Sequence, residues 1–249
     1  MSAGRQFIGQ SPDAQNIMKI GQTSGRVLQK IGSNVKFNIG EGLSSFSPFE
    51  KTGMKIAGQV YRAIDEREDE VDGFTYLAVL SSDELAVYWN NEIQHLITGI
   101  RGTATLGDVV TDIRLIAQRA QTSPRFTRNA EEFQQILQRL QPNTVTLASH
   151  SLGSAVAIFL FNRFPNAPID RNFMFNPAIV FDELEIQQAN QELVQNSVVF
   201  RTQQDLVSLG SALSNFKTKT MPLKNKNFVS GHKLNIFEKL MQDSGIRDV

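Results

Sequence analysis

The pattern of apolar and polar positions predicts strands in the middle of the chain. Three strand-like runs lie at 74–80, 85–89 and 93–100. The short polar links Ser81–Asp83 and Asn90–Glu92 separate them. Runs of this length between short polar turns are typical of neighbouring strands. We therefore expect a meander in this part of the chain.

Strands and helices are predicted to alternate through the second half. Apolar residues at helical spacing predict helices at 48–64, 106–119, 130–140, 155–161 and 181–194. Further strands are expected at 144–148, 172–175 and 197–202. Such alternation favours parallel strands joined by crossover helices. The expected fold class is α/β, with a mostly parallel central sheet flanked by helices.

Residues 1–47 lack this periodicity and are rich in Gly, Ser, Gln and Asn. We divide the chain into an irregular N-terminal extension over 1–47 and one domain over 48–249, a length that suits a single α/β domain. The extension either packs across the domain as irregular structure, docks a protein partner, or has no role of its own.

The composition excludes several functional classes. The 25 Lys and Arg balance the 25 Asp and Glu, so no overall field attracts nucleic acid. The absence of cysteine excludes disulfides, thiolate zinc sites and a thiol nucleophile. We interpret the charged run 65–70 as a solvated loop or helix end, with a metal site as the minor alternative. Without a signal-peptide core or a long apolar run, a soluble, cytoplasmic protein is expected.

The segment Ser149–Ser154 carries the strongest chemical signal. It lies where the strand-like run 144–148 meets the helix-like run 155–161. A serine at such a strand-to-helix turn, here Ser151, is typical of a nucleophile elbow. The turn lifts the hydroxyl clear of the sheet and aims the first N–H groups of the helix at the group under attack. The backbone N–H of Leu152 is therefore a candidate oxyanion donor.

A serine nucleophile needs a base, and the chain has three histidines. His95 lies in a predicted strand before the elbow. His150 is adjacent to Ser151 and points another way, so it is a poor base but can line the pocket. His232, in a loop-like setting near the C-terminus, is the candidate base.

The acid is expected between the serine and the histidine, because that order is typical of α/β-hydrolases. Asp205 follows the strand 197–202 and fits best, with Asp182 in reserve. A second oxyanion donor is expected in the turn Ile100–Thr103, where Gly102 permits close approach and Thr103 offers its N–H or hydroxyl. The alternative there is an ordinary strand-to-helix turn.

Several of these segments together resemble the class 3 lipases, the fungal-lipase type of α/β-hydrolase. The resemblance covers roughly residues 50–240 and rests on Ile100–Thr103, Asp108, Asp112, Ser149–Ser154, Phe175–Pro177, Asp205 and Gly231–His232. Three positions depart from that family. Ser149 replaces a glycine, Val109 replaces a frequent tryptophan, and Gly153–Ser154 replaces a common Gly-Gly.

The resemblance implies roles for individual residues. Ser151 would be the nucleophile, Asp205 the acid and His232 the base. Thr103 and Leu152 would form the oxyanion hole. The family cleaves acyl esters, often of glycerolipids, and uses no cofactor.

Two segments leave alternatives open. The helix predicted at 106–119 either covers the core or acts as a lid that meets lipid. Four lysines either form a solvated basic loop or draw anionic headgroups, giving peripheral contact with a lipid surface: Lys217, Lys219, Lys224 and Lys226.

The sequence thus predicts a lipase-like serine hydrolase. A non-catalytic structural or interaction protein on the same fold is one alternative. Another acyl hydrolase, such as a thioesterase or peptidase, is a second.

Overall fold

The computed structural model describes residues 46–102, 124–178, 190–202 and 216–221. The chain divides into two compact units, Met1–Gly40 and Glu41–Val249, and every described residue belongs to the second. Apart from Phe46 and Ser47, the predicted N-terminal extension lies outside the described residues.

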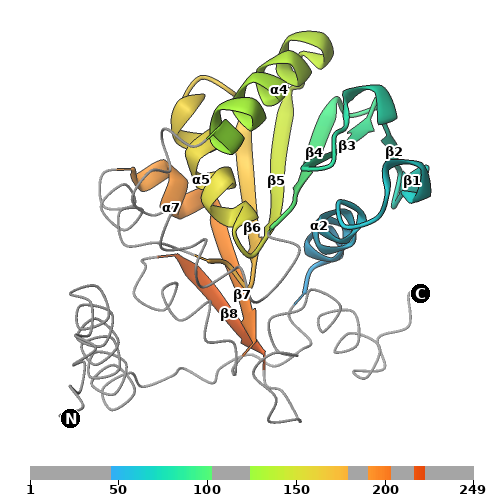
Figure 1. The fold of residues 1–249 in the computed structure, drawn as a ribbon. Coiled ribbons are helices and arrows are strands. Elements are labelled where there is room, and N and C mark those ends of the chain that lie inside the picture. Colours follow the sequence, from blue (N-terminus) through green and yellow to red (C-terminus); the bar gives the residue numbers. More distant parts are fainter. Residues whose placement is uncertain (1–45, 103–123, 179–189, 203–215, 222–249) are drawn as a thin grey trace, which may run out of the picture. The chain divides into compact units, whose positions relative to one another are not determined.

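Within the described residues, eight strands form one sheet in sequence order (Figure 1). The first four pair antiparallel: β1 (Glu70–Val71), β2 (Phe74–Tyr76), β3 (Leu85–Asn90) and β4 (His95–Ile100). From β4 onward the pairing is parallel, through β5 (Thr144–His150), β6 (Ile169–Phe175), β7 (Ser197–Thr202) and β8 (Lys217–Met221). The carboxyl ends of β4 to β8 therefore lie along one edge.

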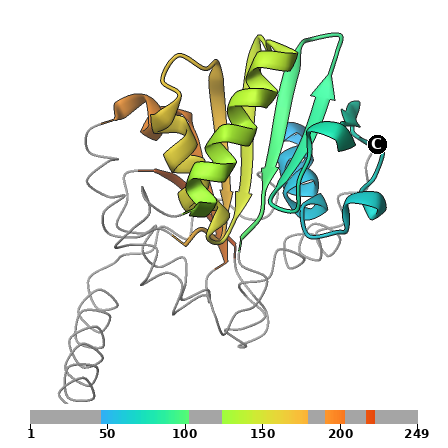
Figure 2. The ribbon, with the colours of Figure 1, turned by 45° about the horizontal axis from the view of Figure 1, so that its top comes forward.

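Helices cover both faces of this sheet (Figures 1 and 2). On one face α2 (Pro48–Gln59) packs with strand residues such as Ala86, Ala148 and Phe173. On the other, α4 (Pro124–Leu140) and α5 (Gly153–Arg163) pack with the intervening residues of the same strands. The short α7 (Gln191–Asn196) follows on the α5 side. The predicted fold class, a mostly parallel sheet flanked by helices as in an α/β-hydrolase, is confirmed.

The helix α2 begins at a capping box. The side chain of Ser47 accepts from the backbone N–H of Glu50 at 3.2 Å, and Glu50 accepts from the N–H of Ser47 at 2.8 Å. Pro48 at the first helical position strengthens this start. Just before the cap, Phe46 stacks on Phe200 of β7 with ring centroids 5.0 Å apart. This segment is thereby anchored to the core.

Several predicted boundaries were wrong. The expected strand 74–80 ends at Tyr76, and its apolar remainder forms a 3-10 turn, η3 (Ala78–Leu80). A second 3-10 turn, η2 (Ile64–Glu66), follows α2. The strand expected from 93 begins at His95, and the helix expected from 130 begins at Pro124.

Two strands were missed. The strand β1 includes Glu70, the last residue of the charged run 65–70. The strand β8 includes Lys217 and Lys219, which we expected in a solvated basic loop or in a segment that draws anionic headgroups. No helix in the described part of the chain is long and apolar enough to cross a membrane.

Candidate active site

Ser151 occupies a strained turn between β5 and α5. Its φ is 54°, in the left-handed region that residues with a side chain rarely adopt. The surrounding backbone holds this conformation: its N–H donates to the carbonyl of Phe175 at 3.1 Å, and its carbonyl accepts from Ser154 at 3.1 Å and from Ala178 at 3.0 Å. A strained serine between a parallel strand and a helix is the geometry of a nucleophile elbow.

The turn after β4 packs directly against this elbow. A Cβ atom added to Gly102 would lie 2.6 Å from the carbonyl oxygen of His150 and 2.8 Å from the Cβ of Ser151. A Cβ atom added to Gly153 would lie 2.4 Å from the carbonyl oxygen of Ile100. Only glycine permits both approaches. The turn predicted to carry an oxyanion donor thus lies beside the candidate nucleophile.

Leu152 is the N-cap of α5 and adopts helical backbone angles. Its side chain is buried in the core cluster that α4 and α5 share. The first N–H groups of a helix have no partner within that helix and carry its partial positive charge. Such a position suits the stabilisation of a developing oxyanion.

The side chain of His150 contacts the segment that follows α2. Its Nδ1 lies 2.7 Å from the hydroxyl oxygen of Tyr61, and the two rings meet edge to face with centroids 5.5 Å apart. The same hydroxyl accepts a hydrogen bond from the N–H of Gly102 at 2.9 Å. Burial raises the pKa of Tyr61 to about 12, so the phenol keeps its proton at neutral pH.

Two arginines contribute to the packing of the turn: Arg101, which belongs to it, and Arg125. The guanidinium of Arg101 lies 5.6 Å from the ring centroid of Tyr61. The carbonyl of Arg101 accepts a hydrogen bond from Arg125, at the start of α4. Arg125 is also 3.6 Å from a carboxylate oxygen of Glu84. Burial lowers the pKa of Arg125, and the charge of Glu84 opposes this shift. The turn is thus held from two sides.

His95 lies at the opposite end of the sheet from Ser151. It is buried at the start of β4, with its Nε2 2.9 Å from the hydroxyl of Thr146. The rings of Phe49 and Phe74 pack on it, with centroid distances of 5.3 Å and 5.5 Å. His95 is therefore a buried histidine that lies away from the elbow.

Three predicted site residues lie outside the described residues, namely Thr103, Asp205 and His232. The same holds for the reserve acid Asp182, for Lys224 and Lys226, and for the helix predicted at 106–119. Their assignments stay predictions. The described part brings together Ser151, Leu152 and Gly102. It also contains the end of β7 at Thr202, three positions before Asp205 in the sequence.

Tyr61 was missed as a contributor to this site. In the sequence it is one of the apolar positions at helical spacing in 48–64, and nothing distinguishes it from a core residue. Its contacts with His150 and Gly102 join residues 89 and 41 positions apart. Only the fold places these segments together.

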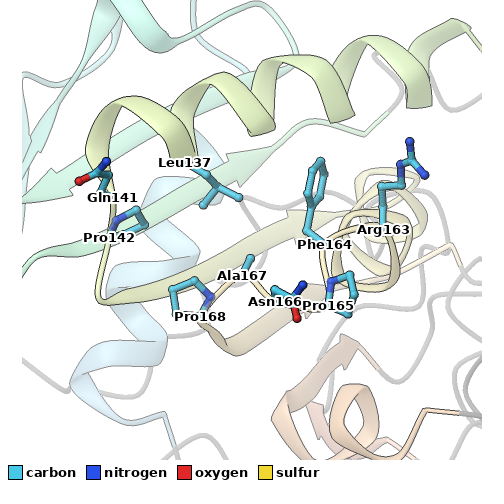
Figure 3. A pocket seen from close by; sticks show the side chains of 9 residues that line it. All are labelled: Leu137, Gln141, Pro142, Arg163, Phe164, Pro165, Asn166, Ala167 and Pro168. Atoms are coloured by element: carbon cyan, nitrogen blue, oxygen red, sulfur yellow. The ribbon is translucent and has the colours of Figure 1, made fainter.

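A surface pocket lies at the other edge of the sheet (Figure 3). It is lined by Leu137, Gln141, Pro142 and the segment 163–168. Pro142 precedes the start of β5 and Pro168 precedes the start of β6. Ser151 follows the end of β5, so this pocket cannot receive a group that the serine attacks. Among the described residues, no three His, Asp or Glu side chains gather as a metal site.

No protein-family model and no curated protein matches the sequence. Among solved structures, the chain is similar to the Lip2 lipase of Yarrowia lipolytica, with 12% identity and a TM-score of 0.48 over 70% of this chain and 78% of that one. It is also similar to a triacylglycerol lipase from Penicillium expansum, with 17% identity and a TM-score of 0.44 over 71% of this chain and 77% of that one. Similarity at this level concerns the course of the backbone and does not identify the reaction.

Proposed function

We propose that the protein is a serine hydrolase that cleaves carboxylic esters, with Ser151 as the nucleophile. One observation carries the proposal. The strained backbone of Ser151 lies between a parallel strand and a helix, and the Gly102 turn packs on its side chain. This juxtaposition supports the proposal, because acyl transfer needs an oxygen nucleophile close to backbone donors for the oxyanion, and the turn that leads to Thr103 packs beside Ser151.

In the proposed mechanism His232 takes the proton of the Ser151 hydroxyl as its oxygen attacks the ester carbonyl. Asp205 orients the imidazole and stabilises its positive charge. The N–H groups of Thr103 and Leu152 stabilise the oxyanion. His232 then protonates the leaving alkoxide, which departs and leaves an acyl-enzyme. A water molecule, deprotonated by His232, releases the carboxylic acid and restores the Ser151 hydroxyl.

The proposed substrate is a lipid acyl ester. Support comes from the sequence resemblance to class 3 lipases, whose motifs include Ile100–Thr103 and Ser149–Ser154. Alkyl esters, thioesters and amides of matched acyl groups would test this assignment. Preference for the esters supports it, while preference for thioesters or amides would place the chain among other acyl hydrolases that share the same nucleophile chemistry.

The nucleophile is tested with a fluorophosphonate probe, which reacts with activated serines. We expect labelling of the wild type and none of Ser151→Ala. Equal labelling of both would refute the assignment. A stable wild type with neither labelling nor turnover would instead favour a non-catalytic structural or interaction protein on this fold.

The acid is tested by comparing Asp205→Asn with the matched variant Asp182→Asn. Loss of the carboxylate that orients the base lowers turnover by about 10⁴-fold in a serine protease. We expect a loss approaching that size for Asp205→Asn and near-normal turnover for Asp182→Asn. The reverse result would move the acid to the reserve position.

A further inference from the structure

The hydroxyl of Tyr61 joins the two segments that meet at Ser151. It lies 2.9 Å from the backbone nitrogen of Gly102 and 2.7 Å from Nδ1 of His150. The first contact is in the turn after β4, and the second is in the last residue of β5. Tyr61 itself follows α2 on a third segment. One oxygen atom therefore ties three parts of the chain together.

The contact with Gly102 has a fixed direction. The N–H of Gly102 can only donate, so the Tyr61 oxygen accepts there. These are the two hydrogen-bond partners of this hydroxyl among the described residues. The direction of the second contact follows the tautomer of the imidazole: with its proton on Nε2 the ring accepts the phenol proton at Nδ1, and with its proton on Nδ1 it donates to the phenol oxygen.

The Tyr61 hydroxyl also lies close to the part of the Gly102 backbone that packs on Ser151. A Cβ atom added to Gly102 would be 2.8 Å from the Tyr61 oxygen and 2.8 Å from the Cβ of Ser151. The phenol oxygen, the Gly102 backbone and the serine side chain thus border one small volume. The Arg101 guanidinium lies over the Tyr61 ring, a favourable cation–π arrangement.

We propose that Tyr61 is a positioning residue, whose hydroxyl fixes the turn leading to Thr103 against the Ser151 elbow by binding Gly102 and His150 together. It contacts no substrate and transfers no proton. The inference rests on the proposed function, because it concerns the placement of the oxyanion donors relative to the nucleophile. Displacement of such donors by about 1 Å can lower turnover about 100-fold.

The test compares Tyr61→Phe with Tyr88→Phe. Tyr88, in β3, donates its hydroxyl to the carbonyl of Glu68 at 2.9 Å, so this control loses a partly buried phenol hydrogen bond outside the described site. Ester turnover is measured at a temperature at which both variants are fully folded. We expect Tyr61→Phe to lower kcat about 10- to 100-fold with KM within about twofold of the wild type. The kcat of Tyr88→Phe stays within about twofold of the wild type.

A second comparison tests the contact between Tyr61 and His150. In His150→Asn the amide oxygen can occupy the place of Nδ1 and accept from Tyr61, whereas His150→Leu has no acceptor. We expect His150→Asn to turn over ester at least about fivefold faster than His150→Leu. Adding His150→Leu to Tyr61→Phe should lower turnover little further, because Tyr61→Phe has already removed the contact with His150.

The outcomes separate this inference from the proposed function. A wild type that neither hydrolyses esters nor reacts with a fluorophosphonate removes the proposed function, and this inference with it. An active wild type with Tyr61→Phe as fast as Tyr88→Phe overturns the positioning role alone. Equal turnover of His150→Asn and His150→Leu also overturns it.

Discussion

The Oγ atoms of Ser149 and Ser154 lie 3.1 Å apart in the interior beneath the elbow. The Ser149 oxygen is also 3.2 Å from the carbonyl oxygen of Phe173. Ser149 has one proton, so donating it to this carbonyl leaves Ser154 as the donor between the two hydroxyls. These two positions are where the chain departs from the glycines of class 3 lipases. Each serine supplies a buried hydrogen-bond partner for the other. The positive φ of this turn is at Ser151 and not at Ser149 or Ser154.

Removal of one hydroxyl from this pair should destabilise the fold. We expect Ser149→Ala to lower the free energy of unfolding by about 1–2 kcal/mol, because two buried hydrogen bonds are lost. Ser154→Ala should cost about half as much, since Ser149 keeps its bond to the Phe173 carbonyl. Urea unfolding of both single variants and of the double variant gives the coupling energy, expected to be at least about 0.5 kcal/mol. Strictly additive effects would contradict the pairing.

The closeness of the Gly102 turn and the elbow predicts a large loss of turnover in Gly102→Ala. The added methyl would lie 2.6 Å from the His150 carbonyl oxygen, which can move only if the elbow moves. We expect turnover to fall about 100-fold or more, as for loss of an oxyanion donor.

Gly53→Ala is the matched control for this substitution. Its methyl would meet the Phe173 side chain at an equally short 2.6 Å, but within α2. Both variants should lose about 1–3 kcal/mol of stability through overpacking, measured by urea unfolding. Only Gly102→Ala should lose turnover. Comparable kinetics for the two folded variants would show that the turn tolerates displacement.

The elbow and the sheet around it could be predicted because local sequence specifies them. Apolar runs on both sides of Ser151 fix a strand before it and a helix after it, and a parallel sheet follows from the alternation of such elements. The approach of Gly102 could also be predicted, since a glycine turn after a neighbouring parallel strand ends at the same edge as the elbow. The elbow, the parallel sheet and the place of the Gly102 turn all follow from the order of strands and helices along the chain.

Features that depend on distant partners could not be predicted. The segment of β8 contains two lysines and two threonines, and its strand conformation depends on pairing with β7. The apolar run that ends in η3 continues β2 without a break, so its composition does not show where the strand stops. The role of Tyr61 depends on three segments meeting, which no local pattern records.

The ion pair between Glu50 and Lys219 should contribute to stability, because it joins the first turn of α2 to β8 away from solvent. Nζ lies 2.8 Å from a carboxylate oxygen, with side-chain exposures of 16% for the lysine and 11% for the glutamate. Lys219→Met leaves the carboxylate of Glu50 without this cation. We expect a loss of about 2–4 kcal/mol, measured by urea unfolding.

The pair of Lys55 with Asp72 provides the control. It has the same 2.8 Å distance, but both side chains are 38% exposed. Lys55→Met should therefore cost less than about 1 kcal/mol. Equal losses of stability in Lys55→Met and Lys219→Met would show that burial does not strengthen the pair of Glu50 and Lys219.

Burial of His95 makes a prediction about acid stability. Its ring packs against Phe49 and Phe74 and bonds to Thr146. This burial lowers the pKa of His95, and the negative charge of Asp170 raises it by a smaller amount. The unfolded chain, with an ordinary histidine pKa of about 6.5, then binds a proton more readily than the folded one. The stabilisation is thus fully present above about pH 6.5 and is lost as the pH falls toward and through the lowered value.

We therefore expect the melting temperature of the wild type to fall between about pH 7 and pH 5 more steeply than that of His95→Gln. The amide of glutamine can still bond to Thr146 but has no proton to take up in this range. Any loss of stability from the substitution itself shifts the whole curve and leaves its slope unchanged, so the slope isolates the titration. The two curves should run parallel above about pH 7, where both side chains are neutral in the folded and unfolded states. Equal slopes below about pH 6.5 would mean that His95 takes up its proton as readily in the folded core as in the unfolded chain.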